Sequence, residues 1–355
     1  MIPQSTPAPR SRRRLLSAAP LSLTLAGSLL LAGCAEPEPR GAGDLEALSG
    51  VSLEVAEDGS PRVTVEEKIE TEETSSRVLK DGDGEDIENG DLALVQTAVA
   101  DPESGEVQAD NFTQGSEAVY VDDQLKEANS VLYDMLEQNK VGAQVAFFMP
   151  ATQMGQQGGA DRLMIFQISG KAPLRADGEP VEVTDESLPE VTLDEETGEP
   201  TIAQPEGDAP KELVVQPLIQ GDGETVGETD HVTVRYKGVN WSEGTEFDSD
   251  WKRGAPTGFG LNQVIEGWTE GLAGQKVGSQ VLLVVPPEKG YGEQGSGEHI
   301  GPNETLVFVV DILHTMPPAE PAPAPSESGA DESAPAEQTP SEDGSGSPEP
   351  SPSDS

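Results

Sequence analysis

The residues best suited to chemistry lie in the C-terminal third of the chain, and they are apolar. Ile265, Trp268 and Leu272 have the i, i+3, i+7 spacing of one helix face. The apolar run at 281–285 predicts a buried strand, and the loop that follows carries Tyr291 between two glycines. An indole and a phenol ring brought together by a helix, a strand and a loop predict an apolar pocket rather than an acid–base centre.

Five motifs follow one another over about 100 residues between Leu213 and Thr315. They are VTVRYKG at 232–238, GTEFDS at 244–249, VIEGW at 264–268, GYG at 290–292 and LVFVV at 306–310. Their order and spacing resemble the FK506-binding-protein (FKBP) family of peptidyl-prolyl cis-trans isomerases. The resemblance implies an α+β fold, in which a twisted antiparallel sheet wraps on a short helix. The alternation of Val232, Val234 and Tyr236 with polar residues agrees with a strand.

The resemblance also implies a prolyl pocket between the helix and the sheet. By matching motif, its catalytic residues would be Tyr236, Phe247, Asp248, Ile265, Trp268, Tyr291 and Phe308. Val264, Arg253 and Ile300 would contact the substrate. Trp268 would form the floor, the Ile265 N–H would bond the substrate carbonyl, and Asp248 would orient Tyr236. Such a site needs no cofactor and no metal.

Three positions depart from the family pattern. Thr257 and Gly258 stand where an aromatic wall residue is common, and Ser296 stands where the family often has a histidine. These departures put affinity for macrolide inhibitors in question more than isomerisation.

Metal-binding patterns are weak. The turn at 81–86 begins like a calcium loop, but its sixth position is Asp86 instead of glycine and its twelfth is Leu92 instead of glutamate. His231, His299 and His314 do not cluster with carboxylates at ligand spacing. We therefore predict no metal site.

Composition narrows the classes of partner. The 355 residues carry a net charge of −45, which disfavours nucleic acid because that ligand binds basic patches. One cysteine excludes an intrachain disulfide. We expect a monomer whose partners are proline-containing exported polypeptides.

The N-terminus carries an export signal. Arginines at 10 and 12–14 precede an apolar run that ends in Leu-Ala-Gly-Cys at 31–34. This pattern is typical of a bacterial lipoprotein signal over 1–33 with Cys34 as the lipid acceptor, although an ordinary secretory signal or a membrane helix stays open. Two acyl chains suffice for stable anchoring. We expect the chain at the extracytoplasmic face of the cell membrane, with the Sec or Tat route left open.

Composition shifts predict the domain boundaries. A flexible spacer is expected over 34–60, a first FKBP-like domain over 61–173 and an acidic, proline-rich linker over 174–210. The isomerase domain is expected over 211–317 and a disordered tail over 318–355. In the first domain, one helix is expected to place Leu125, Ala128, Leu132, Met135 and Leu136 on one face.

The two domains look like a repeat. Gly-Asp-Gly-Glu occurs at 82–85 and again 139 positions later at 221–224, and Lys-Val-Gly occurs at 140–142 and 136 positions later at 276–278. At these offsets the first block has Thr97, Gln108, Ala109 and Leu132 in place of Tyr236, Phe247, Asp248 and Trp268. We therefore predict that the first domain is a degenerate copy without catalytic activity.

Two functions remain open from the sequence alone. The first is an envelope-anchored isomerase that assists folding of exported proteins, favoured by the Cys34 signal and the pocket motifs. The second is a chaperone or scaffold that binds unfolded chains without turnover, favoured by the degenerate copy.

Overall fold

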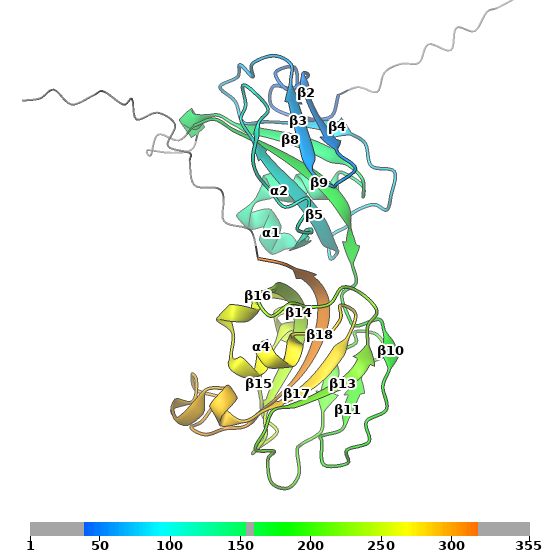
Figure 1. The fold of residues 1–355 in the computed structure, drawn as a ribbon, viewed down its shortest axis with the longest axis vertical. Coiled ribbons are helices and arrows are strands. Elements are labelled where there is room, and N and C mark those ends of the chain that lie inside the picture. The colour runs from blue at the N-terminus through cyan, green and yellow to red at the C-terminus, as the bar shows by residue number, and fades with distance from the viewer. Residues whose placement is uncertain (1–38, 154–159, 319–355) are drawn as a thin grey trace, which may run out of the picture. The chain divides into compact units, whose positions relative to one another are not determined.

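A computed structural model describes residues 39–153 and 160–318 (Figure 1). Within these residues the chain forms two seven-stranded antiparallel sheets and two two-stranded hairpins. No helix in the described ranges is both long and apolar enough to span a bilayer. The predicted signal at 1–33, Cys34 and the tail after 318 lie outside them.

The C-terminal sheet holds the motif-bearing strands. Its order is β10 (Glu179–Pro180), β13 (Val214–Gln220), β17 (Gln280–Val285), β18 (Leu306–Met316), β14 (His231–Asn240) and β15 (Glu246–Ser249), with β16 (Thr257–Gly260) also paired to β14. Every residue of β17 is buried, as expected of a strand covered on both faces. Val281, Leu283 and Val285 face one core, and Leu282 and Val284 face the other.

Helix α4 (Glu266–Leu272) covers the first of these faces (Figure 1). Two glycines allow it to lie close to β17. A Cβ added at Gly267 would lie 2.5 Å from Val285 Cγ1, and one at Gly271 would lie 2.7 Å from Leu283 Cδ2. Because glycine weakens a helix, α4 depends on this packing rather than on helix propensity. The close contact places Trp268 and Leu272 in the core.

The N-terminal sheet has the same strand order. It runs β1 (Gly41–Ala42), β4 (Ser75–Lys80), β8 (Gln144–Met149), β9 (Arg162–Ala172), β5 (Leu92–Ala100) and β6 (Val107–Asp110), with β7 (Glu117–Tyr120) paired to β5. Helices α1 (Asp123–Ala128) and α2 (Ser130–Glu137) lie beside it (Figure 1).

The single helix predicted in this region is two helices, which corrects the prediction. Asp122 caps α1 by accepting from the Leu125 N–H at 2.8 Å. Asn129 interrupts the helical run and caps α2, since its side chain accepts from the Leu132 N–H at 3.1 Å. Ala128 is exposed as a result, whereas Tyr133, which was not predicted, is buried.

The predicted spacer and linker differ from the structure. Within the predicted spacer, β2 (Val51–Val55) pairs with β3 (Pro61–Val65), which begins directly after the spacer, and the side chains of both strands join a core with Ala146 and Phe148 of β8. In the linker, β11 (Val191–Leu193) pairs with β12 (Pro200–Ile202), and these strands pack on Leu282 and Val284. Each hairpin therefore covers the sheet face opposite the helices. Its few apolar residues lie among many acidic ones, so the composition of these segments indicated disorder.

Candidate active site

A pocket of about 430 Å³ opens between α4, β14, β15, β16 and the loop after β17. It is lined by Tyr236, Phe247, Asp248, Phe259, Gln263, Val264, Ile265, Trp268, Tyr291 and Phe308. All seven residues predicted as catalytic are among them, together with Val264. Arg253 and Ile300 do not line it.

The pocket floor is a set of rings that meet edge to face. The Trp268 ring lies 5.0 Å from that of Tyr236 at 90° and 5.4 Å from those of Phe259 and Phe308, between centroids. Phe247 meets Phe308 at 5.4 Å and 85°. These arrangements suit the quadrupoles of the rings and hold the walls in fixed positions. Trp268 is only 4% exposed, so it forms the base of the pocket rather than its rim.

The glycine of the VTVRYKG motif makes room for one of these rings. A Cβ at Gly238 would lie 2.5 Å from Phe247 Cζ and 3.1 Å from Phe308 Cδ1. Gly238 pairs with Asp248 across β14 and β15, and with Phe308 on β18. The strand register thus brings residues of three distant motifs to one point.

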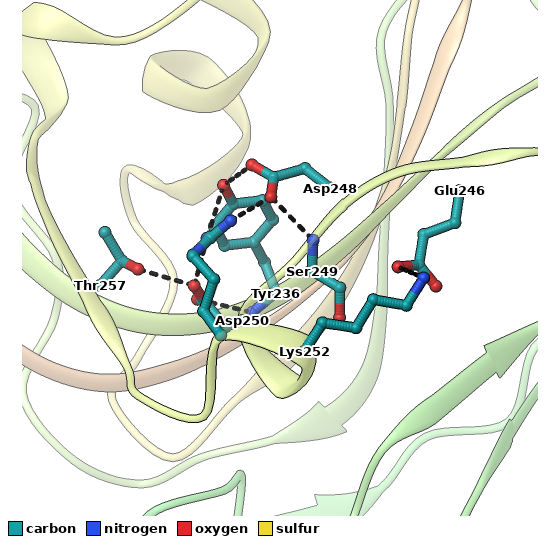
Figure 2. A network of polar contacts seen from close by, with 8 residues as sticks. Tyr236, Glu246, Asp248, Ser249, Asp250, Lys252 and Thr257 are labelled. Atoms are coloured by element: carbon teal, nitrogen blue, oxygen red, sulfur yellow. Dashed lines mark hydrogen bonds and ion pairs between the residues drawn. The ribbon is translucent and has the colours of Figure 1, made fainter. Parts of the chain in front are cut away.

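Polar groups gather at one end of the pocket (Figure 2). The Tyr236 hydroxyl donates to Asp248 Oδ2, and Arg253 bonds the other oxygen of Asp248. Arg253 Nη2 also donates to the Tyr236 oxygen at 3.1 Å. Arg253 therefore acts on the pocket through Asp248 and Tyr236, behind the lining.

The hydroxyl of Tyr236 stays protonated. Burial, followed by the hydrogen bond to the Asp248 carboxylate, raises the pKa of Tyr236 above its ordinary value. At neutral pH this hydroxyl is a fixed neutral donor, so the pair is suited to orientation rather than to proton transfer.

A backbone donor lies at the start of α4. Ile265 is the residue that precedes the helix, and its carbonyl accepts from the Trp268 N–H at 2.9 Å. Its own N–H has no acceptor within the described residues. The first N–H groups of a helix lack intrahelical partners, so this donor is available to a substrate carbonyl.

The loop that carries Tyr291 forms the mouth of the pocket. Tyr291 is 41% exposed and follows the 3₁₀ turn Pro287–Lys289. Lys289 Nζ bonds Glu266 and Glu270 of α4, each at 2.6 Å, which ties this loop to the helix. Ile300 is partly buried against the core and lies outside the pocket lining, and its contact with substrate stays a prediction.

Sequence reasoning missed two lining residues, Phe259 and Gln263. The aromatic wall that seemed to be lacking at Thr257 and Gly258 is supplied by Phe259, one residue further on. The signal was the spacing of Thr257 and Phe259 on β16 with Leu261 directly after it, and Phe259 pairs with Val232.

The described residues contain no group of three or more His, Cys, Asp or Glu side chains arranged to hold a metal ion. Asp81–Asp86 lies between β4 and β5 and pairs at Asp86 with Lys140.

Comparison with known proteins decides the family. A profile described as FKBP-type peptidyl-prolyl cis-trans isomerase matches residues 223–313. The "Probable FK506-binding protein" of Corynebacterium glutamicum is 44% identical over 114 residues, which make up 32% of this chain and 96% of the relative. The chain belongs to the FKBP-type peptidyl-prolyl cis-trans isomerase family. It is therefore an enzyme that acts on proline-containing polypeptides and assists their folding.

Two further proteins are similar to part of this isomerase. The "FK506-binding protein" of Streptomyces anulatus is 41% identical over 117 residues, 32% of this chain and 94% of the relative. Among solved structures, FkpA from Escherichia coli is 39% identical and has a TM-score of 0.29. The matched region makes up 38% of this chain and 54% of the FkpA chain.

Proposed function

We propose that isomerisation takes place in the pocket floored by Trp268, and that the pocket acts by excluding water and gripping a twisted imide. The observation that supports this most strongly is the meeting of Trp268, Tyr236 and Phe308 around one hollow, with ring centroids 5.0–6.4 Å apart. Aromatic faces with few polar groups suit a proline ring whose direction must be fixed.

The reaction in this pocket needs no acid or base. The barrier is amide resonance, roughly 18–20 kcal/mol. An apolar site removes water from the imide carbonyl, which disfavours the charge-separated planar form. The Ile265 N–H is a donor of fixed position, and it lowers the barrier if its bond is stronger in the twisted state than in either planar one. The Tyr236 hydroxyl donates its proton to Asp248, so it fixes the polar wall of the pocket.

The test is the cis/trans rate of a proline peptide with full-length protein. Trp268→Ala removes the floor and is expected to lower kcat/KM by on the order of a hundredfold, or about 2.7 kcal/mol. Asp248→Ala and Tyr236→Phe should cause losses of about tenfold each, since each removes one oriented polar group. Wild-type rates for all three variants would refute this location of the site.

We also propose that the N-terminal sheet is a second, degenerate FKBP-like domain. Three register shifts in the N-terminal sheet, at 78/80, 94/95 and 99/100, recur 139 positions later at 217/219, 233/234 and 238/239. The isolated bridge from Asp86 to Lys140 has its counterpart in Thr225 to Lys276. These likenesses in strand pairing support a duplication, and the exchange of Tyr236 and Trp268 for Thr97 and Leu132 supports loss of activity.

A cell-envelope location completes the proposal. The sequence ending at Cys34 supports a lipid anchor that holds the isomerase at the extracytoplasmic face, where its clients would be exported polypeptides. Membrane fractionation of cells that express the wild type and Cys34→Ala tests this. The wild type should sediment with membranes and the variant should be released. Equal partitioning would contradict the anchor.

A second function is favoured by the N-terminal sheet itself, because a domain without the pocket side chains has no use in catalysis. It would bind unfolded clients as a chaperone. Full-length Trp268→Ala separates the two functions: protection of a proline-free client from aggregation should persist in this variant if the second function exists. If the variant loses both protection and turnover, there is no separate chaperone function and isomerisation is the only activity.

A further inference from the structure

Asp250 is a buried carboxylate directly behind the polar end of the pocket. It is the first residue of α3 (Asp250–Arg253), and none of its surface is exposed. Its oxygens accept from the Thr257 hydroxyl at 2.6 Å, from the Tyr236 backbone N–H at 3.2 Å and from Arg253 Nη2 (Figure 2). A buried charge needs such partners to offset its desolvation.

Arg253 joins this carboxylate to the pocket. Its guanidinium bonds Asp248 and Asp250 and donates to the Tyr236 hydroxyl oxygen, and it lies over the Tyr236 ring at 5.3 Å from the centroid. The Arg253 side chain is 44% exposed, whereas that of Asp250 is fully buried. The rigid end of the network is therefore Asp250, and an arginine on the surface gains a fixed orientation from it.

The N-terminal sheet shows which of the contacts of Asp250 need a negative charge and which do not. There Asn111, 139 positions before Asp250, accepts from the backbone N–H of Thr97 at 2.7 Å, just as Asp250 accepts from that of Tyr236. A neutral side chain thus suffices to hold the strand. The same offset leads from Arg253 to Gln114 and from Asp248 to Ala109. The negative charge at 250 occurs only in the sheet that has an arginine to hold.

We propose that Asp250 is a positioning residue for isomerisation, which clamps Arg253 and thereby fixes the Asp248 carboxylate and the Tyr236 hydroxyl at the pocket. This inference rests on the proposed location of the active site. The negative charge of Asp250 holds Arg253, and its hydrogen bond from the Tyr236 N–H holds the strand. Asp250→Asn removes the charge and keeps the hydrogen bond, so this substitution separates the two roles.

The test is a double-mutant cycle in the full chain. Asp250→Asn keeps an oxygen for the Tyr236 N–H but turns an amide toward Arg253, and should lower kcat by about tenfold while KM changes less than twofold. Arg253→Gln, which installs the residue found at 114, should lower kcat to a similar extent. The double variant should be no worse than Arg253→Gln alone, because the clamp then has nothing to hold. Asn111→Asp is the matched control and should leave turnover unchanged.

Three results would overturn the assignment: wild-type kcat in Asp250→Asn, full additivity of the two losses, or failure of Asp250→Asn to fold. Trp268→Leu, measured alongside, distinguishes an error in the positioning role of Asp250 from an error in the location of the active site. If Trp268→Leu is impaired while Asp250→Asn is not, only the positioning role is wrong. If Trp268→Leu retains wild-type turnover, the location of the site is wrong.

Discussion

The two seven-stranded sheets have one strand order and different side chains at the positions that matter. Pairing across the central strands equates Gln144, Gln167 and Gln96 in the N-terminal sheet with Gln280, Asp311 and Arg235 in the C-terminal sheet. In the first, the three amides form a ladder with bonds of 2.8 and 3.0 Å. In the second, the central amide is replaced by a buried acid that accepts from Gln280 at 2.7 Å.

This contrast teaches that the strand pairing does not require the pocket. The backbone tolerates Leu132 or Trp268, Asn111 or Asp250, and Gln96 or Arg235 at corresponding positions. If the proposed duplication holds, we expect activity to reside in a small set of side chains, and exchanges between the two sheets are the sharpest tests.

The largest effect is expected where the helices differ. Gly267 and Gly271 of α4 correspond, 136 positions earlier, to Val131 and Met135 of α2. Gly267→Ala would push a methyl group against the fully buried Val285, and should cost about 2–3 kcal/mol of unfolding free energy and displace Trp268. Thermal unfolding followed by tryptophan fluorescence reports on this sheet, since Trp241, Trp251 and Trp268 are the three tryptophans of the chain.

Gly301→Ala is the control for this substitution, because nothing lies within 4 Å of its added Cβ. Val131→Ala, at the exposed position of α2, should also be nearly neutral. Unchanged stability in Gly267→Ala would contradict the close packing of α4 on β17.

The second prediction is that the stability of the C-terminal sheet depends on pH through Asp311, a residue with no charged counterpart in the N-terminal sheet. Burial raises the pKa of Asp311 to about 6, against an ordinary value of 3.8. Because the folded state then holds a proton that the unfolded state has released, the folded C-terminal sheet loses stability as the pH rises from about 4 to above 6, by up to about 3 kcal/mol. At pH 4 and below, this penalty is absent.

Asp311→Asn should remove that slope, and its stability relative to wild type should grow with pH. Denaturant unfolding between pH 4 and pH 7.5, followed by tryptophan fluorescence, measures the difference. Parallel pH profiles for the two proteins would show that Asp311 does not titrate as its burial requires. The corresponding Gln167 has no charge, so substitutions there should be independent of pH.

The smallest effect concerns the hairpin that covers the back of the C-terminal sheet. Ile202 of β12 is partly buried against the core that contains Leu282 and Val284. Ile202→Ala should destabilise this sheet by about 1–2 kcal/mol, since the site is only half enclosed. Leu193→Ala, at a side chain that is 41% exposed, is the matched control. Equal stability of both variants would make residues 191–202 the independent linker that the composition indicated.

Much of the pocket was predictable because its residues sit in short motifs that resemble the FKBP family. Tyr236, Phe247 and Phe308 were assigned by that resemblance, and the strand register brings them together. Phe259 was missed because the aromatic wall was sought at Thr257 and Gly258, and it stands at the next position. Ile300 was assigned to the substrate contact by resemblance alone, and its side chain packs partly buried against the same core without lining the pocket.

The two hairpins and the role of Asp250 could not be predicted from neighbouring residues, because contacts between distant parts of the sequence determine them. The apolar residues of 188–202 are sparse, and only contact with a distant strand gives them a core to join. Asp250 reads as an ordinary helix-start residue, and its carboxylate gains meaning only where β14, α3 and β16 converge. The break at Asn129 likewise depended on a capping bond competing with helix continuation.

A single side chain, exchanged between the two sheets, is expected to turn activity off. Trp268→Leu installs in the C-terminal sheet the residue found at Leu132, and kcat/KM for a proline peptide should fall on the order of a hundredfold with the circular dichroism of a folded protein retained. Leu132→Ala in the N-terminal sheet should leave kcat/KM at the wild-type value. Wild-type turnover in folded Trp268→Leu, or a comparable loss in Leu132→Ala, would contradict the account.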